Sequence, residues 1–212
     1  MLYSVKERQV REQQVQEAIR VLRDGGIVAY PTDTVYGLGA NGLDATAVRR
    51  VFTAKRRPLT MAVPLLVADM DMLRSCAISV TEPARLLAER FLPGPLTLVL
   101  SKAPIVPDVV TAGSPTVALR IPDHPVPRAL AAAIGAPLIG TSANRSGLPS
   151  QVTAEEVRAE LGDEVDMVIE GTCRGGVEST IVDCTGAAPR VLRVGAISLD
   201  LIEETLGMRV AR

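Results

Sequence analysis

The sequence predicts one α/β domain, built on a twisted sheet of mixed parallel and antiparallel strands flanked by helices. Short apolar runs bounded by glycine and proline alternate with amphipathic stretches along the chain. No change of composition or internal repeat divides the 212 residues, so we expect a single domain over 1–212. The stretch 170–183 has no helical pattern, which predicts that the later strands run antiparallel.

The helices are predicted from apolar residues spaced three and four apart and from the signals at their ends. Asp44 is a suitable N-cap for a helix that continues to about Lys55 and is ended by Pro58. Thr153 and Glu156 have the spacing of a capping box. The predicted helices are 12–24, 44–55, 82–91, 125–134, 153–161 and 198–206.

The strands are predicted from short apolar runs that end at glycine, proline or small polar residues. The clearest alternates strictly, so that Thr116, Ala118 and Arg120 share one face and apolar side chains occupy the other. The predicted strands are 27–30, 63–67, 96–100, 116–121, 137–140, 167–169, 179–183 and 191–194.

Composition excludes several classes of protein. With 47% hydrophobic and 22% charged residues the chain is not disordered, and a net charge of −1 argues against a polybasic nucleic-acid binder. Three Tyr, two Phe and no Trp disfavour a sheet that stacks RNA bases. The charged N-terminus, the lack of a long apolar run and three cysteines in no zinc or disulfide pattern predict a soluble cytoplasmic protein without membrane contact.

The glycines Gly37, Gly39 and Gly42 match a dinucleotide-binding pattern between a strand and a helix. Six residues separate them from the strand, and Asp69 lies too far along to bind a ribose, so a dehydrogenase is disfavoured and a glycine-shaped turn is the alternative. Thr32, in the loop before them, either binds a ligand at the strand end or bonds its own backbone.

Two cationic groups have alternative interpretations. Lys55 and Arg57 end a helix, where they either face solvent and complement the helix dipole or clamp a polyphosphate. Arg120 lies in an apolar strand, and a guanidinium near the interior needs an anion. That anion is either a carboxylate of the chain or the carboxylate of a substrate. The chain contains neither G-x-S-x-G nor a P-loop, which disfavours hydrolases and P-loop NTPases.

Taken in order, seven segments resemble the YrdC-like family of threonylcarbamoyl-AMP synthases. They cover roughly residues 11–206 and read GGIVAYPTDTVYGLGA (25–40), VFTAKRRP (51–58), FLPGPLTLVL (91–100), TVALRIPDHP (116–125), GTSANRSGLPS (140–150), GGVESTIVD (175–183) and VLRVGAI (191–197). The stretch 59–62, LTMA, departs from the Asn-Pro or Lys-Pro pair of many relatives, and Arg56 replaces a small or polar residue. The resemblance implies the short, single-domain form.

The resemblance implies that L-threonine, bicarbonate and ATP, with Mg²⁺, give threonylcarbamoyl-adenylate, pyrophosphate and water. The product would feed a transferase complex that modifies adenosine 37 of tRNA. No residue is implied as a metal ligand, and Lys55 and Arg57 are the expected catalytic residues. Matching positions imply ATP binding by Lys55, Arg57, Thr116, Ser142, Asn144, Ser150 and Arg193, and threonine binding by Thr32, Arg120, Gly140 (through its backbone) and Ser179.

The residues themselves agree with this chemistry, because two anions must meet and cations are needed to screen them. The alternative is an RNA-binding or ribosome-associated module that uses the same basic surface without catalysis. The near-neutral charge and the few aromatic residues weigh against that alternative.

Overall fold

The protein, a computed structural model, is described for residues 5–173 and 177–211, with side chains from residue 12 onward. It is the expected mixed α/β fold, but its strands form two sheets rather than one. The smaller sheet has the order β7 (Thr141–Ser142), β2 (Gly37–Gly39), β1 (Val28–Tyr30), β8 (Met167–Val168). The larger has the order β10 (Arg190–Arg193), β9 (Thr180–Asp183), β4 (Leu96–Ser101), β5 (Thr116–Arg120), β3 (Leu65–Leu66), β6 (Leu138–Ile139).

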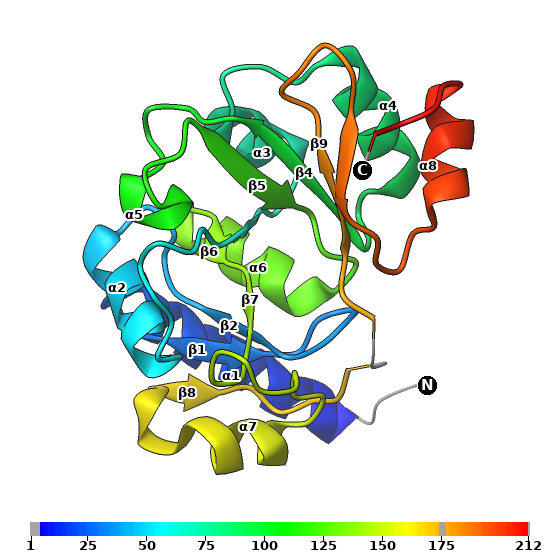
Figure 1. Ribbon diagram of the computed structural model, residues 1–212. Helices are drawn as coiled ribbons and strands as arrows, with labels where there is room; N and C mark the ends of the chain where they lie inside the picture. Colours follow the sequence, from blue (N-terminus) through cyan, green and yellow to red (C-terminus); the bar gives the residue numbers. More distant parts are fainter. Residues whose placement is uncertain (1–4, 174–176, 212) are drawn as a thin grey trace.

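Both sheets mix strand directions. In the smaller sheet β1 is antiparallel to β2 and parallel to β8. In the larger, β4 is antiparallel to β5 and parallel to β9, and β9 and β10 are antiparallel. The expectation that the later strands run antiparallel is therefore confirmed only for β9 and β10 and is wrong for β8 against β1 and for β9 against β4. Figure 1 shows β4, β5 and β9 in one half of the molecule and β1, β2 and β8 in the other.

The second sheet exists because the glycine segment expected to be a turn is a strand. Gly37 and Gly39 lie on β2 against the ring of Tyr30, and a Cβ at either position would come within 2.8 Å of that ring. The glycines therefore allow a close approach between strand and aromatic ring. They do not form a phosphate-binding turn, and the dinucleotide interpretation is wrong for this segment.

Five of the six predicted helices lie within one residue or so of their predicted positions, whereas the first, predicted for 12–24, begins earlier, since α1 starts at Val5. Asp44 caps α2 by accepting hydrogen bonds from Thr46 N and Ala47 N, and the capping box at α7 is present. Two short helices, α3 and α5, were not predicted. The helices are α1 (Val5–Arg23), α2 (Ala45–Ala54), α3 (Met70–Cys76), α4 (Glu82–Phe91), α5 (Asp108–Thr111), α6 (Pro125–Ile134), α7 (Ala154–Leu161) and α8 (Leu199–Leu206), with a 3₁₀ turn at Gly162–Glu164.

Two apolar clusters hold the fold together. The larger fills the space around β4 and β5, and the smaller joins α1, α6, β1 and β3. Leu66 of β3 and Tyr30 of β1 belong to the same smaller cluster, so it links the two sheets. The larger cluster contains Ala29 of β1 and Leu119 of β5, so it too holds the two sheets in a fixed relation. None of the described helices is long and apolar enough to cross a membrane.

Candidate functional site

A cavity of about 250 Å³ lies where the two sheets meet. Side chains from both sheets line it, and a recess of about 50 Å³ beside it shares Thr34, Arg120 and Gly140. Six of the residues expected from the sequence line the main cavity, and a seventh, Thr32, lines the recess. The six are Arg57, Arg120, Gly140, Ser142, Ser179 and Arg193.

Arg120 is buried at the end of β5 and already has a carboxylate partner. Its Nη2 donates to Asp33 Oδ1 at 2.6 Å, and the two side chains are only 8% and 13% exposed. Its Nε donates to Gly94 O at 2.9 Å and its Nη1 to Thr34 Oγ1 at 3.3 Å. Of the five guanidinium N–H groups, one on each terminal nitrogen has no partner among the described residues and can serve a ligand in the cavity.

The loop after β1 carries Thr32, Asp33 and Thr34. The hydroxyl of Thr32 donates to Val35 O at 2.7 Å and accepts from Thr34 N at 3.1 Å, so it bonds its own turn. Thr34 Oγ1 lies 3.1 Å from the same hydroxyl. In this arrangement Thr32 shapes the loop that presents Asp33 to Arg120, as the structural alternative expects. It also lines the recess, so threonine binding by Thr32 stays a prediction.

The cations after α2 bind main-chain carbonyls. Lys55 Nζ donates to Ser142 O and to Asn144 O, the latter at 2.6 Å, and the residue is 2% exposed. Burial is the main cause that lowers the pKa of Lys55, to about 8, with the charge of Arg57 as a second cause. Arg57 Nη2 donates to Ala62 O at 2.8 Å, and burial also lowers its pKa.

Lys55 therefore ties the helix end to the β7 loop, which carries Ser142 into the cavity. Arg57 reaches the cavity itself. Its partners in the loop that departs from the family pattern are the carbonyls of Met61 and Ala62, so these contacts do not depend on side chains there.

Arg193 is a third anchored cation that lines the cavity. Its Nε and Nη2 donate to Ser179 O at 3.1 and 2.9 Å, and its Nη1 donates to Glu178. The hydroxyls of Ser179 and Thr97 lie 2.8 Å apart, and both residues are buried. This wall therefore offers hydroxyl groups and a neutralised guanidinium to the cavity.

Four expected residues line neither cavity. Lys55 lies behind the β7 loop, as described above. Thr116 stands at the start of β5, with its hydroxyl 2.9 Å from Ser114 Oγ, and Ser150 lies in the loop before α7. Asn144 is buried; its Nδ2 donates to Arg145 O and Leu148 O, while its Oδ1 has no hydrogen-bond partner among the described residues.

Three residues of the site were not predicted, namely Asp33, Thr97 and Glu178, whereas the hydroxyl of Thr34 is one that the sequence offers beside that of Thr32. Asp33 and Thr34 stand in the loop that the sequence singled out, and Glu178 adjoins the expected Ser179. Their position beside motif residues is a signal in the sequence. Thr97 carries no such signal, because it sits inside an apolar strand and only the pairing of β4 with β9 brings it to Ser179.

The charges divide the cavity into two parts. Arg120 is paired with Asp33 and Arg193 with Glu178, whereas the hydrogen bonds of Lys55 and Arg57 go to neutral carbonyls. The excess positive charge therefore lies near the end of α2. Such an arrangement suits a highly charged anion at that end and a carboxylate at Arg120. The described residues contain no group of three or more His, Cys, Asp or Glu able to hold a metal ion.

Comparison with known proteins agrees with this geometry. The Sua5/YciO/YrdC family model, described as telomere recombination, matches residues 20–195. The threonylcarbamoyl-AMP synthase of Pyrococcus abyssi is 42% identical over 208 residues, covering 98% of this chain and 61% of the relative. That of Bacillus subtilis is 41% identical over 199 residues, covering 92% of this chain and 57% of the relative.

A solved structure is also similar throughout. The crystal structure of P. abyssi Sua5 complexed with L-threonine superposes with a TM-score of 0.91 at 42% identity, covering 95% of this chain and 59% of that one. The chain thus spans about three fifths of the length of these relatives. Both relatives are named as enzymes, which favours the catalytic interpretation over a silent RNA-binding module.

Proposed function

Because the chain belongs to the Sua5/YciO/YrdC family, we propose that it is a nucleotidyltransferase that makes threonylcarbamoyl-adenylate from L-threonine, bicarbonate and ATP. The observation that carries the proposal is the division of one cavity into an Arg120 end and a more positive α2 end. A carboxylate and a triphosphate can then be held side by side. The named relatives and the threonine complex of Sua5 support the choice of substrate.

The reaction needs two steps that balance. The threonine amine adds to the carbon of bicarbonate, and water leaves to give a carbamate. A carbamate oxygen then attacks the α-phosphorus of ATP, and the bond to pyrophosphate breaks. Both partners of the second step are anions, so screening of their charges and positioning lower the barrier.

Arg120 binds the threonine carboxylate through its two available N–H groups. Arg57 faces the phosphates in the cavity, and Lys55 adds positive charge from behind the β7 loop. Ser179 and the backbone of Gly140 offer hydrogen bonds to the amino acid, and Ser142 and Arg193 to the nucleotide. Asn144, which lines neither cavity, supports the nucleotide end through its backbone, because its carbonyl oxygen holds Lys55 Nζ.

Mg²⁺ enters this proposal as part of the substrate. Glu178, the carboxylate that lines the cavity, is already paired with Arg193. These donors suit an ion carried by the phosphates of ATP, where it neutralises charge that Arg57 does not reach. The ion would screen the phosphates as the carbamate approaches.

The product is a mixed anhydride of a carbamate and a phosphate, and it is reactive enough to need an acceptor close by. We infer that a tRNA-modifying transferase complex consumes it and that the reaction takes place in the cytoplasm. The three cysteines are free thiols, which is compatible with a reducing compartment.

The proposal is tested by release of pyrophosphate from ATP in the presence of L-threonine and bicarbonate. Pyrophosphate release must depend on both L-threonine and bicarbonate. If the protein releases no pyrophosphate but binds RNA with an affinity that falls with salt, the result supports the RNA-binding module instead. L-Serine and L-valine, which each lack part of the threonine side chain, serve as controls for the amino-acid site.

Arg120→Ala should raise the KM for threonine by about 10- to 100-fold, because charged hydrogen bonds are worth about 1.5–3 kcal/mol, and should change the KM for ATP little. This substitution leaves Asp33 without its partner, so Arg120→Lys, which keeps the charge but loses the planar fork, is measured beside it. Equal effects on both substrates would contradict the role assigned to Arg120.

A further inference from the structure

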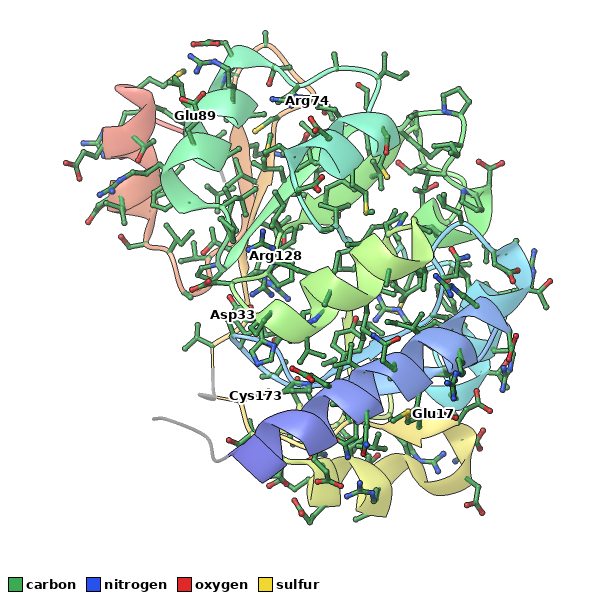
Figure 2. The ribbon with its side chains drawn as sticks, turned by 180° about the vertical axis from the view of Figure 1, so that it is seen from behind. Glu17, Asp33, Arg74, Glu89, Arg128 and Cys173 are labelled. Carbon is green, nitrogen blue, oxygen red and sulfur yellow. The ribbon has the colours of Figure 1, made fainter. Side chains whose placement is uncertain are left out.

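Asp33 faces the guanidinium of Arg120, and its own side chain does not line the cavity. Figure 2 shows Asp33 near the boundary between the half of the molecule that carries α4 and the half that carries α1 and α7, with Cys173 close by. Thr32 N donates to Cys173 Sγ at 3.4 Å, and Thr32 Oγ1 caps the turn, so the backbone on the N-terminal side of Asp33 is held. Asp33 therefore acts on a ligand through its bond to Arg120 and through its negative charge, and not by direct contact.

We propose that Asp33 is a positioning and specificity-determining residue that reserves Arg120 for the carboxylate of an amino acid and keeps phosphate groups away from it. The proposal rests on the proposed function, because it takes Arg120 as the threonine site. It adds a reason for the one buried carboxylate that the chain places against that site.

The need for such a residue follows from the substrates. A triphosphate carries several negative charges, a carboxylate carries one, and a guanidinium binds both with the same forked geometry. An unpaired Arg120 would attract the more highly charged anion, and ATP phosphates would then compete for the amino-acid end. With Asp33 at 2.6 Å the pair is neutral, and a multiply charged phosphate meets a nearby negative charge.

The second part of the proposed role is positioning, because the hydrogen bonds of Arg120 fix its orientation. Arg120 is held at three points by Asp33 Oδ1, Gly94 O and Thr34 Oγ1, which come from two different loops. Only one N–H on each terminal nitrogen remains for a ligand. Two fixed donors match the two oxygens of a carboxylate, so the pairing with Asp33 also sets the direction from which the amino acid is bound.

The other two arginines that line the cavity have no buried carboxylate partner among the described residues, unlike Arg120. Arg57, at the phosphate end, is held by the carbonyls of Met61 and Ala62 and so keeps its full charge. Arg193 is paired with Glu178, but both side chains are more than two fifths exposed, so solvent screens that pair. The desolvated pair at Arg120 is where a negative charge most strongly opposes a second anion.

The test is calorimetric binding of L-threonine to the whole protein, with and without millimolar inorganic phosphate. In the wild type phosphate should leave the Kd for threonine unchanged. In Asp33→Asn, phosphate should raise that Kd at least fivefold by competition, and the Kd without phosphate should also rise because Arg120 is less well fixed. Phosphate competition of equal size in both proteins would overturn the proposal.

Two further variants keep the test decisive. Asp166→Asn is the matched control, because Asp166 pairs with Arg50 near the other end of β1 and lies outside the cavity; it should bind threonine as the wild type does. Asp33→Glu keeps the charge but displaces the guanidinium, so it should weaken threonine binding while still excluding phosphate. If Asp33→Asn does not fold, Asp33→Glu decides, and wild-type threonine affinity in it overturns the positioning role.

These outcomes are distinct from failure of the proposed function. The proposed function fails if the wild-type protein does not bind L-threonine or releases no threonine-dependent pyrophosphate. That result is obtained without any variant of Asp33. A wild type that passes both tests while Asp33→Asn matches it with and without phosphate leaves the enzyme intact and removes only the role of Asp33.

Discussion

Lys55 is unusual among the charged residues because its ammonium group is almost completely buried. A buried charge is tolerated when hydrogen bonds replace water, and here the carbonyls of Ser142 and Asn144 provide them. The same burial favours the neutral amine, which is why its pKa falls to about 8 from 10.5. The residue thus contributes both an anchor for the β7 loop and a strong dependence on pH.

We expect stability to rise with pH through this group. Between pH 8 and 10.5 the folded chain has lost the proton of Lys55 while the unfolded chain retains it, so the unfolded state binds more protons and the free energy of unfolding increases with pH. The full effect is about 3 kcal/mol, reached above pH 10.5 and lost as pH falls through 8.

Urea unfolding of the wild type and of Lys55→Met, at neutral pH and near pH 10, measures this contribution. The comparison is needed because burial raises the pKa of Cys184 to about 12, which lowers stability over the alkaline range in both proteins. A difference between the two proteins that stays constant with pH would show that Lys55 does not titrate in this window.

At this scale the sequence predicted Arg120 well, because the alternation of residues 116–121 places a lone guanidinium in an apolar strand, on the face opposite the core side chains Val117 and Leu119. It left open which carboxylate binds there, and the structure supplies Asp33. That partner was not predictable from spacing, since 87 residues separate the two and no local pattern joins β1 to β5. Thr97 was not predicted as a site residue for the same reason.

At the scale of elements, the segment after β10 packs closely on the start of β9. Thr180 Oγ1 accepts from Gly195 N and Ile197 N and donates to Ile197 O, and Ala196 N donates to Glu178 O. These bonds fix Ser179 and Arg193 at the cavity wall. A Cβ at Gly195 would lie 2.2 Å from Glu178 O and 2.6 Å from Ser179 C, so this approach is possible only for glycine.

Gly195→Ala should therefore destabilise the protein by about 2–3 kcal/mol, because backbone atoms must move. It should also raise the KM for both substrates, since Ser179 and Arg193 move with that backbone. Gly186→Ala is the control in the turn between β9 and β10, where a Cβ would meet Ala188 O at an ordinary 3.6 Å. Thermal unfolding of both variants checks this; similar midpoints would contradict the steric argument.

Helix ends were the most predictable part of the fold. The predicted helices 82–91 and 125–134 coincide with α4 and α6, because N-cap residues, prolines and a terminal glycine are local signals. Strands were predicted in place but too long at β3 and β6, and both β2 and β7 of the smaller sheet were missed. Glycines on a strand carry no apolar pattern, and the ring of Tyr30 that requires them lies on another element.

At the scale of the whole molecule, the cavity draws its walls from both sheets. Loops after β1 and β6 come from one side of the junction, and β9 and β10 come from the other. The apolar cluster of α1, α6, β1 and β3 holds the two sheets together behind the site. A ligand in the cavity would contact residues from both sheets and should therefore increase the free energy of unfolding.

We expect ATP with Mg²⁺ and L-threonine together to stabilise the fold. At ligand concentrations about 100-fold above Kd the gain is about 2.7 kcal/mol for each, which corresponds to about 5–10 °C in Tm for a chain of this length. Thermal scans with each ligand alone and with both measure it. No shift with either ligand would contradict a substrate site at the junction of the sheets.

The hydrogen bonds that hold Arg57 have a consequence for evolution. Its guanidinium rests on the main-chain oxygens of Met61 and Ala62, which every amino acid possesses. The stretch 59–62 is therefore free to drift in sequence, provided that its path is preserved. Homologues that carry other residues at 59–62 can therefore keep the same contacts to this arginine and the same activity. A single inserted residue would change the path of the main chain and displace the guanidinium.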